Sequence, residues 1–105
     1  MASLQHTQLQ LNMQLSHKGY TQIRSKGFRA KTYKDHDGNL MVGYGHRVRP
    51  GDGVCDKDII NTFKGSELLS NDIKRAEEYI LKFVPKNISQ DEFDALVIQA
   101  HNRLI

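Results

Sequence analysis

Residues 27–48 read GFRAKTYKDHDGNLMVGYGHRV, and this stretch decides the fold. Asp37-Gly38 lies between two runs of strand-forming residues, and an Asp-Gly pair in such a place is a strong signal for a β-hairpin. The Pro- and Gly-containing segment that follows, residues 49–53, predicts a loop. We therefore expect a small antiparallel sheet, whose apolar side chains are Phe28, Tyr33, Leu40, Val42, Tyr44 and Val48.

A helix is expected just before the sheet. Ser16 is a suitable N-cap for a helix over about residues 17–26, and Gly27 would end it. Residues 1–14 are a Gln-rich leader whose pattern leaves a strand, a docked helix and a loose end all open. This leader has no apolar core of the length that a signal peptide needs, which favours a cytoplasmic location.

Two helices are expected after the loop. Residues 56–64 predict a short helix that Gly65 stops. Ser66 then predicts the N-cap of a longer helix, which apolar spacings of three and four extend to about Phe83. Pro85 disfavours helical geometry in the residue before it, so this helix ends there.

A last helix is expected from residue 90 onward. Ser89 with Glu92 three positions later forms a capping box at its start. Its apolar residues recur at helical spacing, which predicts one apolar stripe along the helix. The residues of this stripe are Phe93, Leu96, Val97, Ala100 and Leu104.

The length of 105 residues fits one small domain, and the expected helices and sheet make it an α+β domain over residues 15–105. The formal net charge is +3, which we interpret as ordinary solubility charge. Cys55 is the only cysteine, so an internal disulfide and a cysteine-rich metal site are excluded. No stretch of the sequence is suited to span a membrane.

Several motifs together resemble one enzyme family. Gly27-Phe28-Arg29, Tyr33-Lys34-Asp35 and Val42-Gly43-Tyr44-Gly45-His46 are similar to the amino-terminal lobe of the phage-type lysozymes, glycoside hydrolase family 24. Residues 68–72 resemble the connecting helix of that family, and residues 93–97 the start of its carboxy-terminal lobe. The resemblance implies a lysozyme-like fold, with peptidoglycan as the substrate if the chain is active.

The same resemblance argues against catalysis. Glycoside cleavage needs an acid that protonates the leaving oxygen, and the family places a Glu directly before the motif glycine, where this chain has Lys26. A lysine ammonium, with an unperturbed pKa near 10.4, is a poor acid at neutral pH and repels an oxocarbenium ion. Met41 replaces the family threonine, whereas Asp35 retains the second carboxylate. We expect Asp35 to form a partly exposed ion pair with Lys26 or to cap a turn.

A structural pair and the absence of a cofactor follow from the same alignment. His46 and Asp72 occupy places where the family joins sheet and helix, so we expect them to pair structurally. His46 with His36 and Asp35 matches no known metal motif, and we expect no metal and no cofactor. The clustered basic residues form no recognised nucleic-acid-binding module, so nucleic acid is not favoured as a partner.

The resemblance also implies that the second lobe is incomplete. The apolar stripe of the last helix would then face water, and an exposed stripe of that kind marks an interface. We therefore expect a homo-oligomer or a protein partner at Phe93, Leu96, Val97, Ala100 and Leu104. The leading interpretation is an inactive lysozyme homologue of phage or prophage origin that binds and regulates a protein.

Two alternatives stay open. An oligomer could retain muramidase activity if Glu77, Glu78 or Glu92 of a partner chain supplied the acid. A remnant of the cleft could instead bind peptidoglycan without cutting it, through residues such as Asp35 and Tyr44.

Overall fold

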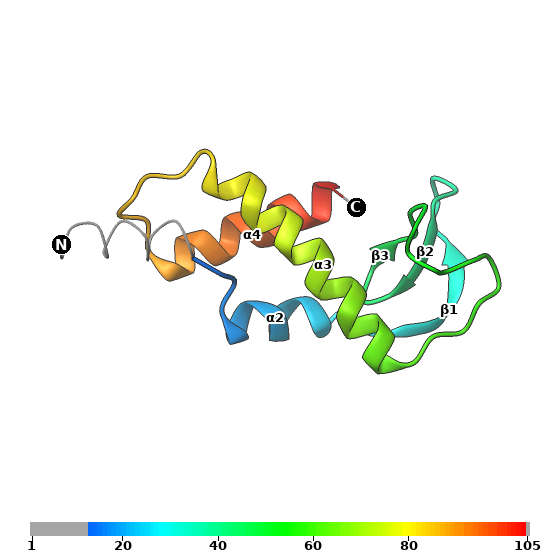
Figure 1. Ribbon diagram of the computed structural model, residues 1–105. Coiled ribbons are helices and arrows are strands. Elements are labelled where there is room, and N and C mark those ends of the chain that lie inside the picture. Colours follow the sequence, from blue (N-terminus) through cyan, green and yellow to red (C-terminus); the bar gives the residue numbers. More distant parts are fainter. Residues whose placement is uncertain (1–12, 105) are drawn as a thin grey trace.

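The computed structural model of the chain describes residues 13–104, without the side chain of Leu104. Its fold is α+β, as expected, with the strands at one end of the molecule and α3 running from them toward the other end (Figure 1). Residues 1–12 of the leader lie outside the described residues. The elements are α2 (His17–Arg24), β1 (Arg29–Lys34), β2 (Leu40–Gly43), β3 (His46–Arg47), α3 (Thr62–Leu81) and α4 (Gln90–Leu104).

The strands form an antiparallel sheet in the order β1-β2-β3, which confirms the prediction made from residues 27–48. Asp37-Gly38 lies in the turn between β1 and β2, and Gly38 has a φ of 85°, a left-handed value that glycine adopts without strain. Val42 of β2 has no exposed surface, because it packs with Val54 and Leu68 in a small apolar cluster. This cluster attaches the sheet to the first half of α3.

The helix before the sheet also forms where expected, although α2 ends two residues earlier, at Arg24. The hydroxyl oxygen of Ser16 accepts a hydrogen bond from the backbone N–H of Gly19 at 3.1 Å, and so caps the first turn. Asp94 of α4 reaches the same place: its carboxylate accepts from the Ser16 backbone N–H at 3.0 Å and from the Ser16 hydroxyl. Gln90 donates to that carboxylate at 2.8 Å. A buried acid thus joins the start of α2 to α4.

The prediction of two helices over residues 56–83 was wrong. A single helix, α3, spans Thr62–Leu81, and the side chain of Asn61 caps it by accepting from the Lys64 N–H at 2.8 Å. Gly65 lies inside this helix because Phe28 packs directly on it. A Cβ atom at position 65 would be only 2.5 Å from Cε1 of the Phe28 ring. The glycine therefore permits a tertiary contact and does not stop the helix.

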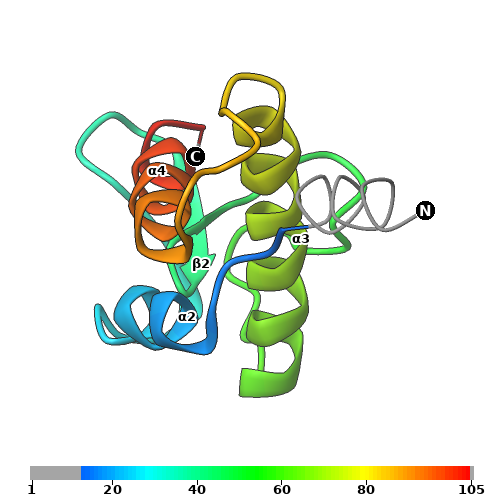
Figure 2. The same cartoon turned by 90° about the vertical axis from the view of Figure 1, so that its left-hand side faces the viewer.

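The capping box at the start of α4 forms as predicted. The Ser89 N–H donates to Glu92 Oε1 at 3.2 Å, and the Glu92 N–H donates to Ser89 Oγ at 3.1 Å. From there α4 runs back along α3, and Figure 2 shows α2 and α4 on the same side of that helix.

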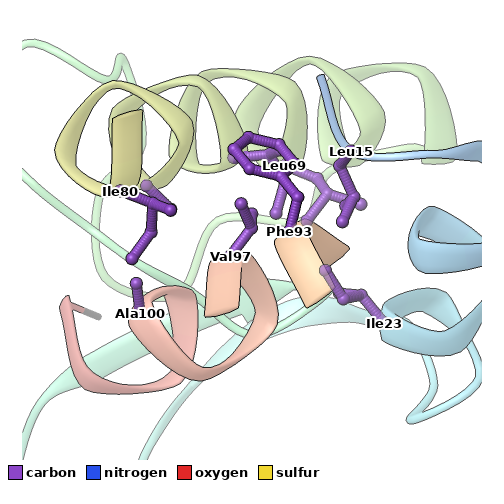
Figure 3. Close-up of a cluster of buried hydrophobic side chains, with 9 residues drawn as sticks. Leu15, Ile23, Leu69, Ile80, Phe93, Val97 and Ala100 are labelled. Carbon is purple, nitrogen blue, oxygen red and sulfur yellow. The ribbon is translucent and has the colours of Figure 1, made fainter. Parts of the chain in front are cut away.

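The apolar stripe of α4 is not the exposed interface that the sequence led us to expect. Phe93 and Val97 have no exposed surface and Ala100 is buried, whereas Leu96 is half-buried. The expectation of an exposed stripe was wrong for Phe93, Val97 and Ala100, because α3 itself covers them (Figure 3). The side chain of Leu104 lies outside the described part. The covering residues come from α3 and from the region of α2, and they include Leu15, Ile23, Leu69, Ile73 and Ile80.

Two adjacent leucines of α3 divide the interior into two clusters. Leu68 packs toward Val42 and Val54 at the sheet end, and Leu69 packs toward Phe93 and its neighbours at the helical end. None of the helices within residues 13–104 combines the length and apolar character that a membrane crossing requires.

Candidate functional site

A pocket of about 310 Å³ lies where the end of α2, the sheet and the end of α4 meet. Its side-chain wall is polar and aromatic, and the remaining lining consists of Ile23 and glycines. No aspartate or glutamate of the described residues lines it. The polar and aromatic lining residues are Lys26, Arg29, Tyr33, Tyr44, His101 and Asn102.

Lys26 lies in the wall of this pocket, on the connection between α2 and β1. Gly27, with a φ of 106°, turns the chain from the helix into the first strand directly after it. The Lys26 ammonium is exposed and donates to Asn102 Oδ1 at 3.4 Å, a long contact that crosses from this connection to α4. The position at which the resemblance implies a catalytic acid therefore presents a cation to the pocket.

Aromatic rings form the side of the pocket that the sheet contributes. The guanidinium carbon of Arg29 lies 4.0 Å from the centre of the Tyr33 ring, a stacked cation–π arrangement. Tyr44 packs with Phe28 at a ring-centre distance of 5.1 Å, and Phe28 in turn rests on Gly65. The close approach of α3 to the sheet thus fixes the Tyr44 side of the pocket.

Asp35 caps the β1–β2 turn. Its carboxylate accepts hydrogen bonds from the backbone N–H groups of Asp37 and Asn39, both at 2.9 Å, and from the Asn39 side chain at 3.2 Å. The backbone hydrogen bond from Asn39 is the main cause that holds the pKa of Asp35 below its ordinary value. Asp35 does not line the pocket, and within the described residues it forms no ion pair with Lys26.

Met41 also lies outside the pocket lining. It is half-buried in β2, where it pairs with Tyr33 of β1 and Arg47 of β3. Of the three positions that the resemblance marks as catalytic, the structure therefore brings only Lys26 to the pocket wall.

His46 and Asp72 lie in direct contact, the pairing expected from the alignment. Nδ1 of His46 is 2.7 Å from Asp72 Oδ2, and both side chains are buried. Sequence reasoning missed a second acid: Asp52 Oδ2 lies 2.7 Å from Nε2 of the same ring and accepts from the Arg49 N–H at 2.6 Å. The turn sequence around Asp52 was a signal for such a capping role. One imidazole ring therefore contacts a carboxylate at each of its two nitrogens. Through these contacts the ring joins the loop after β3 to α3.

The protonation of His46 follows from these contacts. Burial acts to lower the pKa of His46, but the hydrogen bonds and charges of Asp72 and Asp52 outweigh burial, so the pKa is raised above its ordinary value. Two carboxylate acceptors on the two ring nitrogens match an imidazolium, which donates from both. Arg75 also donates to Asp72, so that the buried carboxylate has a second cationic partner. The cluster is an ion-paired structural link.

His101 is the other residue that sequence reasoning missed. It lines the pocket from α4 with only 3% of its surface exposed, and its Nδ1 has no hydrogen-bond partner among the described residues. Burial lowers the pKa of His101, and the positive charge of Lys26 acts in the same direction. Its position four residues after Val97, on the buried face of α4, was the available signal.

Within residues 13–104, no group of three or more His, Cys, Asp or Glu side chains is placed to hold a metal ion.

Comparisons with known proteins agree with the fold and with the motifs. Residues 23–103 match the family described as phage lysozyme. The chain is 36% identical over 86 residues to an endolysin of Salmonella phage P22, a match that covers 80% of this chain and 59% of the relative.

Solved structures of an endolysin and a muramidase domain also match this chain. An endolysin from Escherichia coli O157:H7 phage FAHEc1 matches with a TM-score of 0.78 and 30% identity, over 88% of this chain and 59% of the other. The muramidase domain of SpmX from Asticaccaulis excentricus matches with a TM-score of 0.75 and 27% identity, over 88% and 60%. The chain thus spans about 60% of the length of these three relatives. The matched family and the shared fold together show that the chain belongs to the phage lysozyme family.

Proposed function

We propose that this chain binds the glycan strands of peptidoglycan without cleaving them. The carrying observation is the pocket at the α2–β1 connection, which presents the cations Lys26 and Arg29 and is lined by no carboxylate of the described residues. Endolysins and muramidases are named for their action on cell walls, and family membership is the reason to consider the same polymer here.

The chemistry of glycoside hydrolysis supports one part of this proposal, namely that the chain does not cleave the glycan. A hydrolase protonates the leaving oxygen with a neutral acid and stabilises a positively charged sugar with a second carboxylate. A cation about 4 Å from that sugar would cost roughly 4 kcal/mol at an effective dielectric of 20, or several hundred-fold in rate. The carboxylate of Asp35 is already engaged by three hydrogen-bond donors in its turn.

The same pocket retains features that suit sugar binding. Two tyrosines, Tyr33 and Tyr44, line the pocket beside the polar side chains, and aromatic rings beside a few polar groups are the combination that small-molecule sites use to orient a ligand. A protein-binding role is less well supported, because the stripe that motivated it, at Phe93, Val97 and Ala100, is buried by α3.

Co-sedimentation with purified peptidoglycan sacculi, combined with an assay for released reducing ends, tests the proposal. We expect the protein to sediment with sacculi while reducing ends stay at the level of the blank. Arg29→Ala should weaken retention. Lys31→Ala is the matched control, since Lys31 is an exposed cation of the same strand that does not line the pocket.

Two results would contradict the proposal. Release of reducing ends in proportion to protein concentration would establish a muramidase, the alternative that the family match also supports. Failure of the wild-type protein to sediment with sacculi would remove the glycan-binding role.

A further inference from the structure

We propose that the pocket at the α2–β1 connection selects ligands that carry a free carboxylate, which Lys26 and Arg29 bind together. This inference rests on the proposed function and specifies its ligand class. In peptidoglycan such a carboxylate lies either on the lactyl group of an unsubstituted muramic acid or on a stem peptide.

The first argument is the unbalanced charge of the pocket. In the part of the chain that the structure describes, neither Lys26 nor Arg29 has a carboxylate within ion-pair distance. Two cations in one concave wall focus a positive potential on its contents. A small anion therefore finds complementary charge here that the protein does not itself neutralise.

The second argument is that both cations have hydrogen-bond donors to spare. Lys26 makes one long contact, at 3.4 Å to Asn102 Oδ1, although an ammonium has three donors. The guanidinium carbon of Arg29 lies 4.0 Å from the centre of the Tyr33 ring, and a cation–π contact of this kind occupies none of the guanidinium N–H groups, which can bind a planar, two-oxygen acceptor. A carboxylate has that shape and charge.

The third argument is the unsatisfied histidine in the same wall. His101 has only 3% of its surface exposed. Among the described residues, its Nδ1 is the one buried side-chain nitrogen or oxygen that has no hydrogen-bond partner. Such atoms are rare in folded proteins because leaving one unpaired costs free energy. His101 also lines the pocket, and a neutral imidazole carries a donor on one of its two nitrogens, so the wall holds a third side chain that can donate to a ligand oxygen.

Calorimetric titration with defined fragments tests the inference. The probes are the disaccharide of N-acetylglucosamine and N-acetylmuramic acid with a free lactyl carboxylate, the same disaccharide as its methyl ester, an uncharged N-acetylglucosamine tetramer, and a free stem tetrapeptide. We expect a carboxylate-bearing probe to bind at least about tenfold more tightly than the ester and the tetramer, the gain typical of a charge-assisted hydrogen bond. Whichever of the disaccharide and the tetrapeptide binds identifies the source of the carboxylate.

Two variants link the effect to the pocket. Lys26→Gln keeps hydrogen-bonding capacity but removes the charge, and it should reduce the ratio of the affinity for the carboxylate probe to the affinity for its uncharged counterparts. Lys31→Gln is the matched control and should keep the full preference. Both positions are exposed, so folding is preserved, and thermal unfolding of each variant checks this.

The outcomes separate this inference from the proposed function. If neither the disaccharide acid nor the tetrapeptide bound more tightly than the ester and the neutral tetramer, the carboxylate preference would be overturned while glycan binding would stand. Retention on sacculi without measurable binding of any carboxylate probe would also overturn it. Failure of wild-type protein to bind both sacculi and every fragment would overturn the proposed function itself.

Discussion

Substitution of Gly65 by alanine should destabilise the protein, although alanine is the better helix former. The new Cβ would lie 2.5 Å from Cε1, 3.2 Å from Cδ1 and 3.6 Å from Cζ of the Phe28 ring. Carbon atoms in contact normally lie about 3.5–4.0 Å apart, so the ring has to shift by roughly 1 Å. Phe28 cannot shift freely, because it packs on Tyr44.

Two opposing contributions set the magnitude. Overpacking in a close contact of this kind costs roughly 1–3 kcal/mol, whereas replacing glycine with alanine inside a helix gains about 1 kcal/mol. We expect a net loss of up to about 2 kcal/mol, which corresponds to a fall in Tm of up to roughly 10 °C for a domain of this size. Thermal and urea unfolding, followed by circular dichroism at 222 nm, measure both quantities.

A double-mutant cycle gives the decisive comparison. In a Phe28→Ala background the clash disappears, and Gly65→Ala should become stabilising by up to about 1 kcal/mol, because only helix propensity remains. If Gly65→Ala destabilised both backgrounds equally, the glycine would not be explained by its contact with Phe28. If Gly65→Ala stabilised the wild-type protein, the packing argument would be wrong.

Three further predictions concern the core and the buried charges. Phe93→Ala should cost roughly 3–5 kcal/mol, since the ring has no exposed surface, and a urea midpoint close to that of the wild type would contradict the packing shown in Figure 3. Asp94→Ala should cost roughly 1–2 kcal/mol because it leaves the partly buried donors of Ser16, at the start of α2, unpaired; calorimetry measures the loss, and an unchanged Tm would refute the link between α2 and α4. The raised pKa of His46 means that its contribution to stability is fully present below the unfolded value, about pH 6.5, and is lost as the pH rises through the folded pKa. The difference in Tm between wild type and His46→Gln should therefore shrink from pH 6 to pH 9, and parallel curves would show that the imidazolium is not the stabilising form.

Local sequence signals predicted the elements that depend on local contacts. Asp37-Gly38 marked the hairpin, Ser16 marked the start of α2, and Ser89 with Glu92 marked the start of α4. In each case the hydrogen bond or backbone angle that forms the element lies within a few residues of the signal, so that a pattern in the sequence suffices.

Long-range contacts decided the features that sequence reasoning missed. Gly65 has the appearance of a helix stop, and only the approach of Phe28, 37 positions earlier in the numbering, explains why it lies inside α3. Likewise, α3 covers the stripe of α4, which no local pattern could reveal. The local patterns around His101 and Asp52 indicate a buried helix position and a turn, but they do not indicate the partners Lys26 and His46, which the fold brings near them.

The division of the interior at Leu68 and Leu69 has a consequence for how the protein responds to a ligand. Arg29 and Gly43 bring the sheet end to the pocket, while Ile23 and His101 bring the helical end to it. A ligand that contacts both walls of the pocket would link the two apolar clusters, and the sheet end and the helical end would then unfold together. We expect the amide protons of the sheet to exchange with solvent sooner when the pocket is empty than when a ligand occupies it.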